Sequence, residues 1–437
     1  MKKLIWVMVV LCLVAAVAFG AVSMRGTTLP SWQTAGTDAA SEPGTDPTAG
    51  WVMDEIGPLS EEDAAAVAGT TNSATPAAPE AEAQSGIGRV DFEALYALHD
   101  PEEKVLSIGG TEESWGDYFY VLYTQGSQVE NYFDSMDMYY GIRHAWEDPV
   151  EEGGESTYAD AVVESAGNLL RQLAALERFA EENSVEISEE MLATIDSQKK
   201  EDIASVLGEE GTADEFFEYL AGQYLSPEMY NRVVTQNVLY QECFNQLYGK
   251  DAEKLPDETA MKYLAENNYR SAAHILFLFN DPDTGEVRDE DTLAGKKDEL
   301  AALGKELRNI SDPAARAKKF LEKTAELSED SGKAYYPDGY TYTPGTMVTP
   351  FEEAVDALAD YEISEVVETD YGYHLIIRLP LEADAVVEFS SGTGEARTGR
   401  MLAANQEYGD RLQALSDSLE VKWLDGAEAP VLTDFIR

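Results

Sequence analysis

Six residues that could take part in chemistry or grip a substrate occur within one segment of this 437-residue chain. Histidine, carboxylate and hydroxyl groups can orient one another by hydrogen bonding, and a methionine and a phenylalanine four residues apart share one face of a helix. Each residue alone would ordinarily be a core or packing residue. Their joint occurrence indicates a binding or catalytic site. In chain order they are His274, Asp330, Met347, Phe351, Thr369 and His374.

Three predicted strands position the two histidines. Ala272–Phe279 (AAHILFLF) alternates as a strand does, which places His274 on one face. Tyr373–Leu379 is predicted as a second strand that carries His374, and Glu365–Thr369 as a third. The Asp-Tyr-Gly run between the last two supplies a turn.

Helices are expected between these strands. Glu290–Leu307 and Pro313–Leu327 show helical patterns, Phe351–Leu358 reads as a short helix, and Tyr335–Tyr342 reads as a turn-rich aromatic loop. The order of strand, helices, short helix, strand and strand predicts a small α+β domain with a mixed or antiparallel sheet and surrounding helices.

Four motifs in this segment resemble the parvulin family of peptidyl-prolyl isomerases, also called the PpiC or rotamase domain. They are the A-x-H-I-L opening, S-E-D-S at Ser328–Ser331, G-T-M-V-x-P-F-E-E-A at Gly345–Ala354, and E-I-S-x-V-V-E-T-x-Y-G-Y-H-L-I-I at Glu362–Ile377. The resemblance covers about Ser271–Leu379. It implies catalysis of cis/trans isomerisation at X-Pro bonds, with no cofactor, no metal and no covalent intermediate.

The resemblance also implies roles for individual residues. His274 and His374 match the paired core histidines of the family, and Thr369 matches the hydroxyl residue that bonds to them. Asp330 matches a polar position that is Cys or Asp in the family, although a helix-end role in the Ser-Glu-Asp-Ser turn is an equal alternative. Tyr371 lies next to this network. We expect the network to hold tautomers and shape the site rather than to transfer protons.

Met347 and Phe351 match the pocket that holds the proline ring, and Tyr342 is a candidate replacement for a pocket aromatic. One stretch departs from the family pattern. Between Gly332 and Gly345 the sequence GKAYYPDGYTYTPG lacks a glycine pair and a pocket leucine. The departure predicts reduced activity or an altered substrate preference.

The charge balance excludes several classes of partner. The chain has 31 basic and 83 acidic residues, a formal net charge of −52, so nucleic acid is not an expected partner. The acidic loop NDPDTGEVRDED has no basic cluster for a phosphorylated substrate. Cys12 and Cys243 show no redox or zinc pattern.

The N-terminus predicts export. Lys2 and Lys3 precede an apolar run of about 19 residues, close to the ~20 that span a bilayer. Residues 1–25 are therefore a cleaved signal peptide or a transmembrane anchor, and the protein is secreted or membrane-anchored. Residues 26–88, rich in Thr, Ala, Pro and Glu, are predicted to be a disordered linker.

A mostly α-helical domain is predicted over residues 89–270. A strand near Val105 leads through a Gly-Gly turn into a helix near Glu113. A further helix is predicted to begin at Ser188, where a cap precedes acidic first-turn residues. The remaining expected helices cover Thr157–Asn183, Thr212–Tyr224, Ser226–Tyr248 and Pro256–Asn268.

Three parts of the chain together resemble exported foldases of the SurA and PrsA type. They are this helical region, the parvulin-like segment at 271–380, and a C-terminal helix and tail at 381–437 that is amphipathic over Glu395–Leu419. That resemblance implies an extracytoplasmic isomerase and foldase that acts on unfolded or proline-containing exported polypeptides. The alternative is a catalytically weak or inactive holdase chaperone on a parvulin fold. A surface structural role is a third possibility, without a specific motif.

Overall fold

The structure is a computed structural model that describes residues 88–151, 153–390 and 394–437. The predicted signal or anchor segment and nearly all of the predicted linker lie outside the described residues. Among the residues that are described, no helix is long and apolar enough to cross a membrane. The described residues divide into two compact units, and helices α5 (Tyr158–Glu182) and α8 (Pro227–Tyr248) contribute to both.

One unit comprises residues 88–171, 212–230 and 419–437 of the described chain. Its antiparallel sheet has the order β2-β1-β9, with β1 at Lys104–Ile108, β2 at Thr111–Ser114 and β9 at Val421–Trp423. Its other elements are α3 (Phe92–Tyr96), α4 (Trp115–Tyr140), α7 (Ala213–Ala221), the 3₁₀ turn η3 (Leu432–Phe435) and the first part of α5.

The expected helix start near Glu113 was wrong by two residues. Gly109 and Gly110 both have positive φ angles, so the chain reverses in a hairpin and continues as β2 instead of entering a helix. Helix α4 begins only at Trp115, where the Ser114 hydroxyl accepts a hydrogen bond from the Asp117 amide.

The other unit comprises residues 172–211 and 231–418. One of its hydrophobic cores is helical and includes Phe179, Cys243, Phe244 and Tyr408. This core is built from the end of α5, α8 from Asn231 onward, and three further helices: α6 (Glu189–Leu207), α9 (Asp257–Glu266) and α13 (Gly399–Ser418). The predicted cap at Ser188 is confirmed, with Met191 completing the capping box.

The same unit contains a four-stranded antiparallel sheet of order β4-β3-β6-β5. These strands are β3 (Arg270–Leu278), β4 (Tyr340–Tyr342), β5 (Val367–Glu368) and β6 (Gly372–Leu379). The hairpin of β7 (Val386–Phe389) and β8 (Ala396–Thr398) follows the sheet. The predicted aromatic loop Tyr335–Tyr342 was thus wrong at its end, where three residues pair with β3 as an edge strand.

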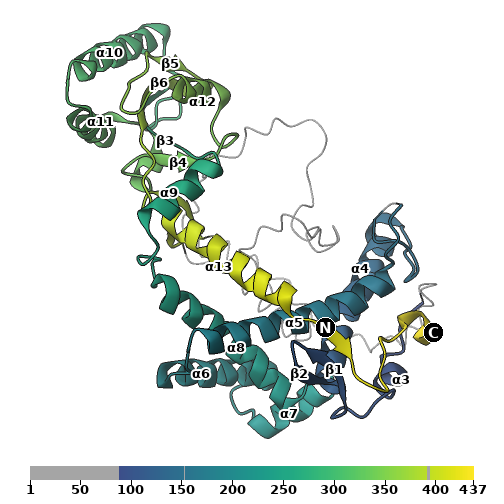
Figure 1. Ribbon diagram of the computed structural model, residues 1–437. Helices are drawn as coiled ribbons and strands as arrows, with labels where there is room; N and C mark the ends of the chain where they lie inside the picture. Colours follow the sequence, from purple (N-terminus) through teal and green to yellow (C-terminus); the bar gives the residue numbers. More distant parts are fainter. Residues whose placement is uncertain (1–87, 152, 391–393) are drawn as a thin grey trace. The chain divides into compact units, whose positions relative to one another are not determined.

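Helices cover both faces of this sheet (Figure 1). One face packs its apolar residues against α10 (Glu290–Arg308) and α11 (Pro313–Leu327), with Leu300, Leu307 and Phe320 in the core. The other face packs against α12 (Thr349–Asp356) through Phe351 and Val355. Because β3 and β6 are buried on both faces, their polar side chains need partners within the protein.

The close β3–β6 pairing predicts opposite effects of one substitution at two glycines. A Cβ atom on Gly372 would lie 2.1 Å from the Phe277 carbonyl oxygen, whereas one on Gly295, inside α10, meets nothing within 4 Å. Gly372→Ala is expected to lower the free energy of unfolding by about 1–3 kcal/mol through overpacking. Gly295→Ala is expected to raise it by roughly 0.5–1 kcal/mol.

Urea unfolding of both variants followed by circular dichroism measures these changes. A Gly372→Ala protein as stable as its parent would contradict the backbone contact that the structure places there.

Candidate functional site

The two histidines meet on one face of the β3–β6 pair. In the antiparallel register His274 lies opposite Ile376 and His374 lies opposite Leu276, so the imidazoles are diagonal neighbours. Their Nδ1 atoms are 2.9 Å apart and their rings are nearly parallel at 12°. His274 is 8% exposed and His374 is 4% exposed. Two buried imidazoles at this distance must share a hydrogen bond.

Each histidine has a second partner at its outer nitrogen. The Thr369 hydroxyl lies 2.8 Å from His374 Nε2, and an Asp330 carboxylate oxygen lies 2.9 Å from His274 Nε2. Thr369 Oγ1 also accepts the Tyr371 backbone amide at 3.2 Å. The structure thus joins four of the predicted polar residues in one line and puts Tyr371 at its end.

Hydrogen-bond capacity assigns a direction to this line. An ionised Asp330 can only accept, so His274 Nε2–H donates to it, and in a neutral His274 ring Nδ1 is then the acceptor. His374 Nδ1–H then donates to His274, and His374 Nε2 accepts the hydroxyl proton of Thr369. Both imidazoles are neutral in this arrangement, and every donor meets an acceptor.

The electrostatics agree with a neutral His374 and an ionised Asp330. Burial, with a smaller contribution from nearby His274, lowers the pKa of His374 to about 3. For Asp330, burial favours the neutral acid, but the hydrogen bond and electrostatic attraction of His274, with further hydrogen bonds from Tyr340 and the Gly332 amide, outweigh it and lower the pKa to about 2. At neutral pH Asp330 is therefore ionised and His374 is neutral.

The Ser-Glu-Asp-Ser segment occupies the place beside β3 where a neighbouring strand would otherwise pair, and this brings Asp330 to β3. Strand β4 pairs only with the first residues of β3. Further along, the Ser328 hydroxyl accepts the Leu276 amide at 3.1 Å, and the Glu329 amide donates to the Leu276 carbonyl at 2.8 Å. Asp330 also accepts the Gly332 amide at 3.0 Å and caps the 3₁₀ turn η2 (Ser331–Ala334). The contact with His274 and the helix-end role are therefore both present.

Glu329, inside the same segment, is held by a separate set of ions. Its carboxylate pairs with Arg288 at 2.7 Å and Lys296 at 3.0 Å, and it accepts the Leu278 amide at 2.8 Å. Although burial opposes ionisation of Glu329, the bonds to these two cations lower its pKa. This ion-pair network fastens the segment to the edge of β3, because the Leu278 amide would otherwise lack a partner there.

The predicted apolar residues lie on the histidine face of the sheet. Phe351 is buried and meets His274 edge-to-face at a centroid distance of 5.3 Å, and it meets His374 at 5.8 Å. Tyr342 packs on Phe351 at 6.2 Å, and Met347 is a half-buried member of the same cluster. The Tyr342 hydroxyl is buried without a hydrogen-bond partner among the described residues, and burial raises its pKa.

Sequence reasoning missed three groups that shape this site. Glu352 of α12 accepts the amides of Gly345 and Met347, both at 2.9 Å, and so fixes the loop that carries Met347. The Ser364 hydroxyl accepts the Ile376 amide at 3.0 Å. The Tyr340 hydroxyl donates to Asp330 at 2.5 Å. An acidic residue that follows a Pro-Phe helix start was a usable signal for Glu352, but no local signal pointed to the others.

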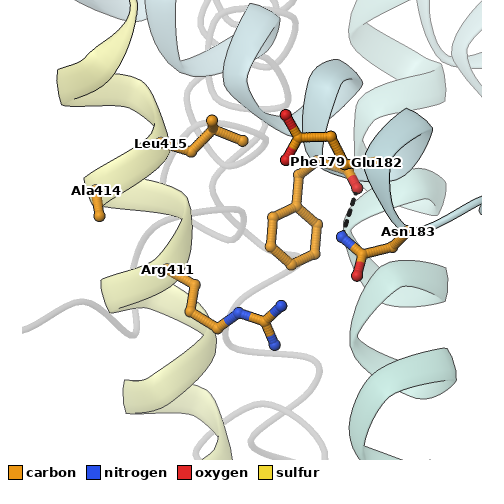
Figure 2. A pocket seen from close by; sticks show the side chains of 6 residues that line it. All are labelled: Phe179, Glu182, Asn183, Arg411, Ala414 and Leu415. Atoms are coloured by element: carbon orange, nitrogen blue, oxygen red, sulfur yellow. Dashed lines mark hydrogen bonds between the residues drawn. The ribbon is translucent and has the colours of Figure 1, made fainter.

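A shallow pocket of about 410 Å³ lies elsewhere in this unit, on the helical core (Figure 2). Phe179, Asn183, Arg411 and three further residues line it, and the Arg411 guanidinium lies 5.1 Å from the centre of the Phe179 ring. None of the predicted site residues lines it. The described residues also contain no cluster of three or more side chains able to hold a metal ion.

Comparison with known proteins assigns the class of this site. Residues 274–379 match the family described as Rotamase, the PPIC-type PPIase domain. The two histidines, Asp330, Thr369 and the apolar cluster all lie inside the matched residues. This chain therefore contains a PPIC-type, or parvulin, peptidyl-prolyl isomerase domain.

Two kinds of curated protein are similar to the chain. Chaperone SurA of Burkholderia lata is 33% identical over 112 residues, which are 25% of this chain and 25% of that protein. Foldase protein PrsA of Clostridium tetani is 26% identical over 245 residues, 53% of this chain and 63% of that protein. The chain spans less than two thirds of either relative. The crystal structure of PrsA from Bacillus subtilis aligns with 61% of this chain and 88% of its own, at 18% identity and a TM-score of 0.23.

The lowered pKa of His374 predicts acid-dependent stability. Its folded-state pKa of about 3 lies below the ordinary 6.5, so the unfolded chain takes up a proton first as the pH falls. The resulting stabilisation is complete above about pH 6.5 and is lost toward pH 3. Between pH 7 and pH 5 the free energy of unfolding should fall by roughly 2 kcal/mol more in the parent than in His374→Gln.

Urea titrations at the two pH values measure this difference. An identical pH dependence in the parent and His374→Gln would show that the buried imidazole does not resist protonation.

Proposed function

We propose that this chain is an extracytoplasmic peptidyl-prolyl isomerase and foldase that assists the folding of exported proteins. The observation that carries the proposal is the directed hydrogen-bond line from Thr369 to Asp330, which lies beside the apolar cluster of Phe351, Met347 and Tyr342. The proposed catalytic residues are His274, Asp330, Thr369 and His374. The proposed substrate contacts are Met347, Phe351, Tyr342 and Tyr371.

The chemistry of prolyl isomerisation suits this arrangement. Rotation about an amide bond costs ~18–20 kcal/mol because resonance is lost, although the X-Pro bond itself has little preference between cis and trans. A twisted amide is less charge-separated than a planar one, so an apolar, water-poor surface stabilises it relative to the substrate. Phe351 and Met347 would hold the proline ring, while neutral His274 and His374 keep this face free of positive charge and rigid.

Exported polypeptides are the proposed clients, and the outside of the cytoplasm is the proposed location. Two observations support this proposal. The N-terminal apolar run behind Lys2 and Lys3 has the composition of a signal or anchor segment. The similar proteins are named a chaperone and a foldase.

We propose the domain limits 1–25, 26–88, 89–270, 271–380 and 381–437, with the first segment cleaved or kept as an anchor.

One structural feature favours a second function, the holding of unfolded clients without catalysis. Four apolar side chains at and just beyond the end of α4 face solvent: Met138 is 76% exposed, Tyr139 74%, Tyr140 68% and Ile142 45%. We call these residues the α4 tip. Side chains of this size are rarely clustered on a surface without a partner. An extended apolar stretch of an unfolded chain is the proposed occupant, because methionine and tyrosine adapt to varied side chains.

Isomerase activity should depend on Met347 and not on Met138. Met347→Ala removes side-chain contact from the proposed proline site and should lower kcat/KM of the full chain by about tenfold, since one side chain contributes on the order of 1.5 kcal/mol. Met138→Ala makes the same chemical change at an exposed position and should leave kcat/KM unchanged. A protease-coupled assay with an Ala-Pro peptide measures both variants.

Absence of isomerisation above the uncatalysed rate in the parent chain would end the enzymatic proposal. An equal loss of activity in both methionine variants would show that Met347 does not line the proline site.

Client holding should show the reverse pattern. Replacement of Met138, Tyr139 and Tyr140 by Ser removes three exposed apolar side chains and should weaken client affinity by about a hundredfold, because each contact contributes on the order of 1 kcal/mol. Light scattering by an aggregating unfolded client measures the suppression. Met347→Ala should suppress aggregation as the parent does. Undiminished suppression by the triple variant would exclude the α4 tip as the client surface.

A further inference from the structure

Tyr340 occupies a position at the site that no predicted role explains. It begins the edge strand β4, and its hydroxyl donates to Asp330 Oδ2 at 2.5 Å, the same oxygen that accepts His274 Nε2–H. Its ring meets the His274 ring at a centroid distance of 5.7 Å and 63°. Tyr340 therefore contacts both members of the Asp330–His274 pair.

The space around the hydroxyl is matched to it. A Cβ atom on Gly332 would lie 2.0 Å from the Tyr340 hydroxyl oxygen, so a side chain at this position would displace the hydroxyl. The Gly332 amide donates to the other oxygen of Asp330 at 3.0 Å. Three donors, from β3, β4 and the η2 turn, therefore hold one carboxylate. A hydrogen bond to an ionised acceptor is stronger than a hydrogen bond between neutral groups.

A second aromatic layer holds Tyr340 itself. The Tyr336 ring packs on Tyr340 at 4.8 Å and on Phe389 of strand β7 at 5.4 Å. Tyr335 reaches the same Phe389 at 6.0 Å. All three tyrosines belong to Gly332–Gly345, the stretch in which the sequence departs from the family pattern. The altered stretch therefore supplies this aromatic layer as well as the bond to Asp330.

We propose that Tyr340 is a positioning residue of the isomerase site, whose hydroxyl keeps the Asp330 carboxylate aimed at His274 Nε2 and thereby sets the direction of the whole hydrogen-bond line to Thr369. The kinetic part of this inference rests on the proposed isomerase function. The structural part, which concerns the carboxylate and the two imidazoles, does not.

The physical argument follows from the number of donors on Asp330. Burial alone would raise the pKa of this carboxyl group, and the three hydrogen bonds reverse that effect. Without the tyrosine hydroxyl, Asp330 keeps two donors and can rotate away from His274. Whenever Asp330 rotates away, His274 Nε2 loses its strong acceptor, so the opposite tautomers of His274 and His374 become accessible.

Tyr340→Phe tests the inference, because it removes the hydroxyl and keeps the ring in the aromatic layer. Tyr336→Phe is the matched control, since the structure places no hydrogen bond on the Tyr336 hydroxyl among the described residues. Both variants should retain the parental circular dichroism spectrum and unfolding temperature within a few degrees, which establishes that each one folds.

Nuclear magnetic resonance gives the readout that does not depend on activity. In the parent and in Tyr336→Phe, ¹⁵N spectra of the full chain at pH 7 should show His274 protonated at Nε2 and His374 at Nδ1. In Tyr340→Phe both rings should show mixed tautomers. The Asp330 carboxyl pKa, followed by ¹³C shifts, should rise by about one unit, the size expected for one bond to a charged group. Unchanged tautomers and an unchanged carboxyl pKa would overturn the proposal.

A double-mutant cycle gives the kinetic readout. Tyr340→Phe should lower kcat by about tenfold with KM unchanged, because the hydroxyl does not touch the substrate. Added to Asp330→Asn, the same change should cost about twofold or less, since Tyr340 acts through Asp330. Independent, multiplying losses would overturn the positioning role. If the parent chain has no isomerase activity, the proposed function fails, while the resonance measurements still decide the role of Tyr340.

Discussion

The 2.9 Å contact between the Nδ1 atoms of His274 and His374 constrains the rest of the isomerase domain. Both imidazoles are buried on one face of the β3–β6 pair, where a charged ring would have to be stripped of water. One ring must donate and the other accept, so each outer nitrogen has a fixed role as well. The line therefore requires an acceptor at the His274 end and a donor at the His374 end. Asp330 and Thr369 meet these two requirements.

Neither end residue lies in the central strands, so the fold must hold non-strand segments against the sheet. Ser328 and Glu329 bind the edge of β3 through their side chains and backbone, and this attachment delivers Asp330 to His274. Thr369 reaches His374 because the turn after β5 is closed by a hydrogen bond from the Thr369 amide to the Gly372 carbonyl. Local turn geometry, rather than strand pairing, thus completes the polar line.

The apolar cluster on the same face complements this polar line. Phe351 lies nearly perpendicular to both histidine rings and in contact with them, so the imidazoles form part of the wall of the proposed proline site. A rigid, neutral and largely dehydrated wall is suited to a reaction in which an amide loses charge separation. The α4 tip, in the other unit, has the opposite character, because its apolar side chains face solvent and belong to no described core. Catalysis and client holding would therefore use different physical properties of the chain.

The sequence by itself determined the elements with a clear period and the order of the site residues. Alternation predicted β3 and β6 within two residues, and the helical pattern with its N-terminal proline gave Pro313–Leu327 as observed. Only the tertiary structure showed that β4 is an edge strand, that Tyr340 donates a hydrogen bond to Asp330, and that Glu352 accepts one from the Met347 amide. These contacts depend on strand register and on segments distant in sequence, for which neither propensity nor periodicity carries a signal. The short-range pattern specified which residues could act, and long-range packing specified which of them touch.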